Sequence, residues 1–528
     1  MALYCLRDYF IDLADNFWLL LMKDNEGKQT TINFYTNIVT LVIHICVGIY
    51  YTPYLVGKLG LAAYGILPLA LIINQYISVA TGVLTHSYTR FYSIALREGD
   101  YVKATQCIST SLYVVFSLVL ILSPFIVAII YNIEKVFNIP FGLIVDAKLL
   151  FTYTILSFFL SLLSSILNVT LYALNRLDLM NILKIIRTVL KLPLTICCFE
   201  FFSVNIAYVG LVGLVSEFVV LVVSWYFFVR HKPHDVQISL YQFDKALLFS
   251  ILAMSLWVLI HQCGDTLLYR TDNLIVNHYW GTVKSGALGA VSELGGYIMT
   301  VVSVVGSLFG PLILAAYAEK KHEKVVSLAL SQSYIVGSLS AILAGTVAGL
   351  GSSLLSVWIG NQLSDYSIWL ALKMIVVPFY AAGGILAYVY RAWNQVKYPA
   401  IATILLGAVD IVTVVVVVNL VEVSYIIEVV LSINAIVSII QCFFINSYFV
   451  NKIYKGCSSK LLIVAVKILL IFMVSYCLGR LLLLYFRVDT WPLLVFCLIV
   501  VSVMTAIIMF FVFFSSEERK QLINLIKL

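Results

Sequence analysis

The chain has 528 residues, of which 62% are hydrophobic and 11% are charged, and its net charge is +7. Its mean hydropathy is +1.03. This composition leaves almost no material for a water-soluble domain, and the positive charge is explained by membrane topology and contact with anionic lipid, so no nucleic-acid partner is required.

Fourteen apolar stretches are each long enough to cross a bilayer core of about 30 Å, which takes about 20 helical residues. Backbone groups in lipid must pair within their own segment, and strands of a barrel would be shorter and alternate in polarity. The pattern therefore predicts an all-α polytopic membrane protein. The predicted crossings begin near Ile32, Tyr64, Gln106, Ala147, Asn181, Asn205, Leu247, Ala287, Val325, Ser367, Pro399, Ser424, Leu461 and Trp491.

The connectors between these crossings alternate between lysine-rich and lysine-poor. The lysine-rich set, which includes both termini, holds 21 of the 33 Lys and Arg residues; the other set holds 6, and 6 lie inside crossings. The positive-inside rule places the lysine-rich set in the cytoplasm. We therefore predict that both termini are cytoplasmic.

The chain contains two copies of one six-crossing unit, displaced by about 220 residues. Gly60 and Gly65 after the first crossing match Gly281 and Gly286 after the seventh at an offset of 221. Two further matches follow in order at offsets of 223 and 219, and they align residues 95–100 with 318–323 and 173–176 with 392–395. Repeats an even number of crossings apart have the same membrane orientation, so they are related by an axis along the membrane normal.

These patterns predict about 14 transmembrane helices in two six-helix lobes, with an appended helix pair. The N-terminal segment has an amphipathic stretch that can lie on the membrane surface. The predicted divisions are a cytoplasmic amphipathic segment (1–31), the first lobe (32–230), a cytoplasmic linker (231–246), the second lobe (247–450), and helices 13 and 14 with a cytoplasmic tail (451–528).

Several short motifs carry a family resemblance. They are Thr52-Pro53-Tyr54-Leu55 with Lys58-Leu59-Gly60 and Tyr64-Gly65, then Arg97-Glu98-Gly99-Asp100, Leu171-Tyr172-Ala173-Leu174-Asn175-Arg176-Leu177-Asp178, and Thr271-Asp272-Asn273-Leu274-Ile275 with Gly281 and Gly286. This set resembles the Wzx-type polysaccharide flippases of the multidrug/oligosaccharidyl-lipid/polysaccharide exporter superfamily. The extension over residues 1–31 departs from the usual pattern of that family.

The resemblance implies a flippase of the bacterial inner membrane. Such a protein moves undecaprenyl-diphosphate-linked oligosaccharide repeat units from the cytoplasmic to the periplasmic leaflet by alternating access, for O-antigen, lipopolysaccharide or capsule biosynthesis. Its partners would be the polyprenyl-diphosphate-linked glycan, membrane lipid, and a polysaccharide polymerase with its chain-length regulator. Two alternatives stay open, a lipid II flippase and a cation-coupled multidrug efflux antiporter.

No catalytic or metal-binding pattern stands out in the sequence. There is no phosphate-binding glycine loop, HExxH motif or nucleophile elbow, and the ten cysteines lack CxxC spacing. We expect no enzymatic activity and no cofactor or metal, with coupling to a proton or sodium gradient as an open possibility.

The predicted fifth crossing carries three cations, Lys184, Arg187 and Lys191, on one helical face. Charges at this depth are costly and mark functional sites, so we predict that the face receives the diphosphate of the substrate. Lys184 and Arg187 could instead reach the interface with their long side chains. Lys191 lies 13 residues before Val204, and Glu217 lies 13 after it, which also fits a buried ion pair.

Further ionisable residues lie on the seventh to eleventh crossings. His261 and Asp265 are four residues apart near the outer end of the seventh crossing, and a His beside a carboxylate can exchange protons near neutral pH; a polar cluster in the outer loop is the simpler interpretation. The remaining predicted substrate contacts are Arg270 and Lys373. The predicted sites for ion coupling or buried pairing are Glu217, His261, Asp265, Asp272, Glu293 and Asp410.

Overall fold

The computed structural model describes residues 25–513, apart from 234, 239–241, 308–312, 314–315, 318, 394 and 422–424, together with residue 519. All regular secondary structure in these residues is helical. The prediction of an all-α protein is therefore confirmed. The predicted amphipathic surface helix lies outside the described residues.

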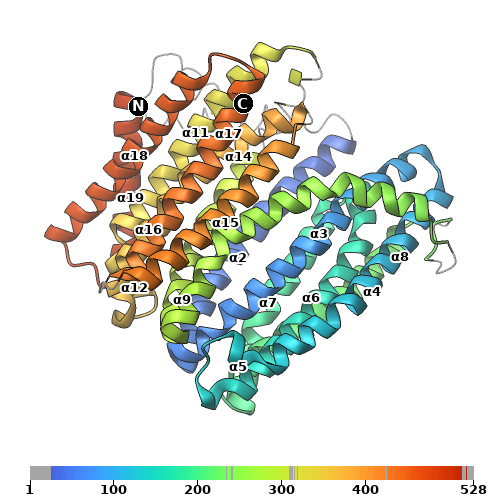
Figure 1. The fold of residues 1–528 in the computed structure, drawn as a ribbon, viewed down its shortest axis with the longest axis horizontal. Coiled ribbons are helices and arrows are strands. Elements are labelled where there is room, and N and C mark those ends of the chain that lie inside the picture. The colour runs from blue at the N-terminus through green and yellow to red at the C-terminus, as the bar shows by residue number, and fades with distance from the viewer. Residues whose placement is uncertain are drawn as a thin grey trace.

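The first lobe runs from α2 to α8 and is drawn in blue to teal in Figure 1. Its long helices are antiparallel neighbours joined by short turns, as expected for successive crossings. Its elements are α2 (Asn25–Tyr64), α3 (Ile66–Glu98), α4 (Tyr101–Tyr131), α5 (Ile133–Val136), η1 (Phe141–Leu143), α6 (Ile144–Ala173), α7 (Leu177–Phe201) and α8 (Ile206–His231).

The second lobe begins with the long helix α9 and is followed by the appended pair, drawn in red. Its elements are α9 (Lys245–Ser307), α11 (His322–Gly349), α12 (Gly351–Trp358), η2 (Asn361–Tyr366), α13 (Ser367–Met374), α14 (Val376–Ala392), α15 (Lys397–Leu420), α16 (Ile426–Ile439), the π-helical turn η3 (Ile440–Ile445) and α17 (Asn446–Ile453). The appended pair is α18 (Ser458–Tyr485) and α19 (Trp491–Ile508), which ends in the π-helical turn η4 (Met509–Phe513).

Each of the fourteen predicted crossings falls on a helix if α9 is counted twice, once on each side of Gly281. Within the described residues, 11 helical segments are long and apolar enough to span a membrane, and one of them covers both halves of α9. The protein is thus a multi-pass membrane protein, while the number of crossings stays a prediction.

The internal repeat is visible in the backbone. Gly60 breaks α2 and Gly281 breaks α9, with φ angles of 77° and 79°. Both angles lie in the left-handed region, which favours glycine because it has no Cβ. The same bend therefore recurs at the offset of 221 that the sequence indicated.

Hydrogen bonds at two turns refine this register. The Asp100 N–H donates to the Ala95 carbonyl (2.9 Å), and the Lys321 N–H donates to the Ala316 carbonyl (3.1 Å). The structural offset here is 221, which corrects the offset of 223 taken from the alanine match. The later turns pair residues 176 with 171 and 395 with 390, both at 2.8 Å, so the predicted offset of 219 holds there.

The two lobes meet at the end where α2 and α9 bend. The Gly65 backbone crosses so close to α9 that a Cβ on Gly65 would lie 1.9 Å from the Thr282 carbonyl oxygen. Nearby, the Asn138 N–H donates to the Asn277 side chain (3.1 Å), and the Trp358 indole donates to the Ile49 carbonyl (2.7 Å). This is the lysine-poor end, and the lobes spread apart toward the opposite end (Figure 1).

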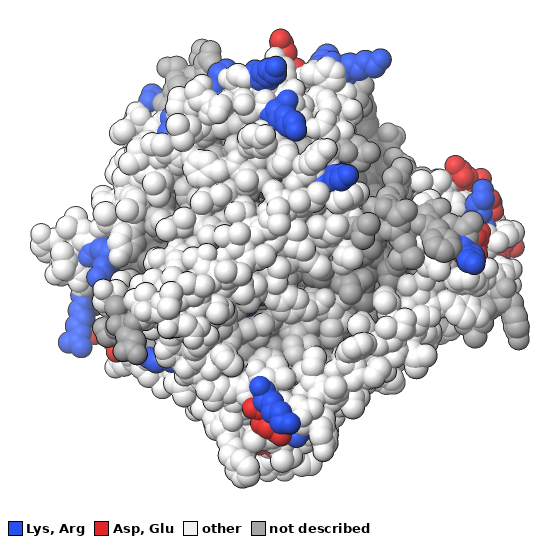
Figure 2. Space-filling view, viewed as in Figure 1, with Lys and Arg blue, Asp and Glu red and all other residues white. Residues whose placement is uncertain are grey.

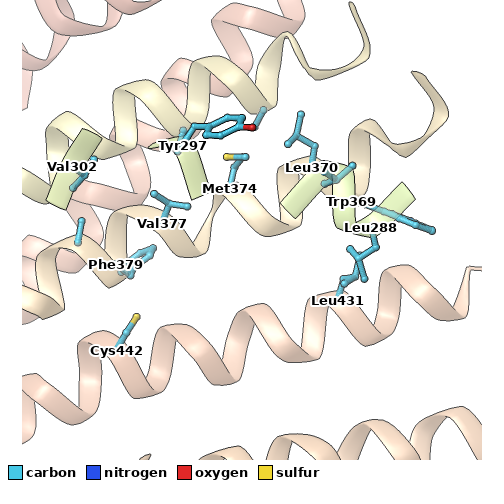
Figure 3. Packing of buried hydrophobic residues seen from close by; sticks show 14 of the residues in the cluster. Leu288, Tyr297, Val302, Trp369, Leu370, Met374, Val377, Phe379, Leu431 and Cys442 are labelled. Atoms are coloured by element: carbon cyan, nitrogen blue, oxygen red, sulfur yellow. The ribbon is translucent and has the colours of Figure 1, made fainter. Parts of the chain in front are cut away.

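Most of the second lobe's core is apolar. Figure 3 shows Leu288 and Tyr297 from α9 in one cluster with Trp369, Leu370 and neighbouring residues of α13 and α14. On the face shown in Figure 2, most charged side chains lie near the margins, and the broad middle is uncharged. This distribution fits a surface that faces lipid hydrocarbon.

The appended pair packs mainly on α11. The hydroxyls of Thr346 on α11 and Ser475 on α18 share a hydrogen bond of 2.8 Å, and Ser475 also donates to the Ile342 carbonyl (3.0 Å). Small polar residues at such a contact let helices approach closely within a membrane. α18 is therefore held by the second lobe.

Candidate functional site

The basic face of α7 is formed as the spacing predicted. Lys184, Arg187 and Lys191 are three and four residues apart on one continuous helix, so they share a face. The start of α7 is fixed by Asp178, which accepts hydrogen bonds from Arg176 (3.0 Å) and from Gln29 on α2 (2.9 Å). The face is thus held in place by the first helix of its own lobe.

Arg187 forms an ion pair with Glu217 on α8. Its Nε lies 2.6 Å from Oε1, and its Nη2 donates to Oε2 at 2.9 Å. Both carboxylate oxygens of Glu217 are therefore engaged by one guanidinium, which is a strong bidentate arrangement. The depth count had paired Glu217 with Lys191. That count was wrong because equal depth in a helical hairpin does not fix which way each side chain turns.

Lys191 makes no ion pair within the described part of the chain. It is half-buried and lies within electrostatic reach of Glu217 and Glu293. Lys184 is exposed and donates only to the Asn181 amide oxygen (3.3 Å). Two of the three cations on this face are thus without a carboxylate partner among the described residues.

Glu293 on α9 joins the two lobes through hydroxyl groups. Its Oε2 accepts hydrogen bonds from Thr52 (2.8 Å) and Tyr64 (3.2 Å) on α2, and its Oε1 accepts one from Tyr297 (3.1 Å). Sequence reasoning identified Glu293 but not these three donors. Thr52 and Tyr64 flank the first loop motif, so their place beside a bend was the available signal.

The second lobe has its own buried cluster of charges. Lys373 on α13 forms an ion pair with Asp272 on α9 and lies 3.5 Å from the Asn434 amide oxygen. Asn434 on α16 also donates to Asp410 on α15 (3.0 Å) and to the Leu268 carbonyl (2.6 Å). Asp272 and Asp410 are only 5% and 4% exposed. Two carboxylates, one ammonium and one amide thus form a closed network.

This network bears on two predicted sites. Lys373 would have to leave Asp272 in order to contact an anionic substrate, so its role as a substrate contact stays a prediction. Asp410 keeps one buried oxygen, Oδ1, without a hydrogen-bond partner among the described residues. Sequence reasoning missed Asn434, although an amide within the strongly apolar twelfth crossing was a usable signal.

His261 and Asp265 lie within α9 and not near its outer end or in a loop. Their side chains are 3.7 Å apart, and both are half-buried. Asp265 is 16 residues before the Gly281 bend, so the pair lies about midway along the first half of the helix. This corrects the predicted location, because a continuous helix runs through the expected loop. Arg270, on the same helix, is exposed and has no ion pair in the described part of the chain.

The structure therefore separates the predicted residues into groups. Lys184, Arg187, Lys191 and Glu217 belong to the first lobe, with Glu293 facing them across the junction. Asp272, Lys373 and Asp410 form the network of the second lobe, while the His261–Asp265 pair and Arg270 stand apart. Among the residues that the structure describes, no group of three or more His, Cys, Asp or Glu side chains is placed to hold a metal ion.

Comparison with known proteins identifies the fold. No family model matches the chain. It is 26% identical over 500 residues to the uncharacterized membrane protein EpsK of Bacillus subtilis (strain 168), covering 93% of this chain and 96% of that protein.

Solved structures of transporters share the architecture. An inward-facing multidrug resistance MATE family transporter of the MOP superfamily has a TM-score of 0.64 at 13% identity, covering 80% of this chain and 100% of that one. The lipid II flippase MurJ, in an inward closed conformation, has a TM-score of 0.63 at 14% identity, covering 91% and 98%. The chain thus has the fold of the MATE transporters and of MurJ.

Proposed function

We propose that this protein is a flippase for polyprenyl-diphosphate-linked oligosaccharide repeat units, which it moves from the cytoplasmic to the periplasmic leaflet for surface polysaccharide biosynthesis. The observation that carries the proposal is the basic face of α7, where Lys184 and Lys191 have no ion-pair partner among the described residues. Unpaired cations at membrane depth are costly and mark substrate pathways. A lipid diphosphate supplies the missing negative charge at headgroup depth.

The shape of the molecule supports alternating access. The lobes are sealed at the lysine-poor end by the Gly65 crossing and spread apart toward the lysine-rich end. A substrate headgroup would enter from the lysine-rich, cytoplasmic side and meet the α7 face, while its polyprenyl chain stays in lipid. Separation of Gly65 from α9 would then open the periplasmic side.

The appended pair α18–α19 favours a lipid-linked substrate over a small drug. MurJ covers 91% of this chain, whereas the MATE transporter covers 80%. The difference, 11% of 528 residues or about 58, is close to the length of the appended pair, which spans residues 458–513. MurJ is described as a lipid II flippase, and a long lipid tail needs a path outside the central chamber.

Ion coupling is the less developed part of the proposal. Glu293, bound by three hydroxyls at the lobe junction, and Asp410, with one unpartnered oxygen, are the carboxylates best placed to exchange a proton or a sodium ion during the cycle. We propose an inner-membrane location with cytoplasmic termini, and a polysaccharide polymerase with its chain-length regulator as functional partners.

A direct test follows lipid-linked glycan in a strain that lacks the gene. The proposal expects undecaprenyl-linked repeat units to accumulate on the cytoplasmic face while long surface glycan disappears, and the gene on a plasmid to reverse both effects. Normal glycan with increased dye sensitivity would instead identify a multidrug antiporter. Arrest of peptidoglycan synthesis with lipid II accumulation would identify a lipid II flippase.

A further inference from the structure

A cavity lies on the outer surface of the second lobe, away from the charged clusters. It has a volume of about 260 Å³ and is formed where η3 and α17 meet the start of α18. One side is apolar, with Phe443, Phe444, Tyr448 and Leu462, and the other carries Ser447, Asn451 and Ser459. Phe444, Tyr448 and Leu462 are 41%, 59% and 56% exposed, so the cavity opens on the face toward lipid.

The polar side of the cavity offers unpaired hydrogen-bond donors. α18 is a 28-residue helix whose N-cap, Cys457, provides no side-chain cap, so the first N–H groups from Ser458 onward lack acceptors within the helix. Ser447 is 9% exposed, and its hydroxyl has no hydrogen-bond partner among the described residues. A long helix N-terminus beside a buried free hydroxyl is suited to an anion.

Basic residues surround this end of the cavity. Lys455 and Lys460 flank the start of α18 in the lysine-rich connector, and both are exposed without an ion pair to any described residue. The π-helical turn η3 forms the apolar wall, and such turns are frequent at functional sites. The cavity thus combines positive charge at the membrane surface with apolar side chains that extend into the bilayer.

We propose that this cavity binds the phosphate headgroup of an anionic phospholipid from the cytoplasmic leaflet. The phosphate lies against the α18 N-terminus and the Ser447 hydroxyl, Lys455 and Lys460 balance its charge, and an acyl chain follows Phe444 and Leu462. Basic pockets between membrane helices bind such headgroups. The site goes beyond the proposed transport activity, and it fastens α18 to the second lobe.

The test measures lipid binding by the full-length protein purified in detergent. Phosphatidylglycerol, phosphatidylethanolamine and inorganic phosphate are each titrated, and the melting temperature and the lipid retained in native mass spectrometry are recorded. We expect phosphatidylglycerol alone to bind and stabilise. The double variant Lys455→Gln/Lys460→Gln should weaken its binding about 30-fold, since each lysine near a charged headgroup contributes roughly a fivefold factor.

Two further variants separate a built site from general attraction. Lys320→Gln/Lys324→Gln removes the same charge from another lysine-rich connector, and it should change phosphatidylglycerol binding by less than about twofold. Ser447→Ala removes one hydrogen bond without adding volume and should weaken binding by about fivefold. Equal losses in the two double variants would overturn the proposal, as would equal stabilisation by phosphatidylethanolamine or by inorganic phosphate.

Discussion

In the first lobe, Glu217 pairs with Arg187 and leaves Lys191 without a carboxylate of its own. In the second lobe, Lys373 pairs with Asp272 and shares an amide with a further buried carboxylate. The first lobe thus carries an excess of positive charge at membrane depth, whereas the second lobe carries a closed network with an excess of negative charge. Two copies of one unit have diverged into a side suited to bind an anion and a side suited to exchange a cation.

Removal of the carboxylate from the first lobe should have the largest effect. Glu217→Gln leaves the Arg187 guanidinium partly buried without its partner, and breaking a buried pair in this way costs about 3–5 kcal/mol. We expect a large fall in melting temperature in detergent. The swapped pair Arg187→Glu/Glu217→Arg should recover most of the loss; failure to do so would mean that surrounding groups, not the pair itself, determine stability.

Breaking the network of the second lobe should cost slightly less. Lys373→Met leaves Asp272 and Asp410 as buried carboxylates without a cation, and we expect a loss of about 3 kcal/mol. The second substitution Asp272→Asn should restore part of this stability, because it removes one of the uncompensated charges. An additive double variant in thermal unfolding would show that the ion pair is not energetically coupled.

The seal between the lobes should be sensitive to a single methyl group. Gly65→Ala places a Cβ 1.9 Å from the Thr282 carbonyl oxygen, so the helices must separate. Such overpacking costs about 1–3 kcal/mol. Gly296→Ala is the matched control on α9, because a Cβ there meets nothing within 4 Å. Equal melting temperatures for the two variants would contradict the close crossing.

The smallest effect on stability is expected at Lys191, together with a large effect on transport. Lys191→Met removes a half-buried cation that has no ion-pair partner among the described residues, so the melting temperature should stay constant or rise by the equivalent of up to about 1 kcal/mol. Transport of lipid-linked glycan should fall at least tenfold, measured as accumulated precursor in cells. Full transport by this variant would remove Lys191 from the substrate path.

Sequence alone determined the helical class, the order of the helices, the repeat and the basic face of α7. These features depend on hydropathy and on spacing along one helix, which are local properties. The bends at Gly60 and Gly281 were equally accessible, because a repeated glycine at a turn indicates the same backbone geometry twice.

The tertiary structure decided which charges meet. The pairing of Glu217 with Arg187 depends on how α7 and α8 are rotated about their own axes, and helical spacing does not fix that rotation between neighbours. The three hydroxyls on Glu293 and the amide of Asn434 come from helices far apart in the chain, so only packing brings them together. The position of His261 was missed for a related reason, because the helix α9 continues well past the point where its polar residues suggested an end.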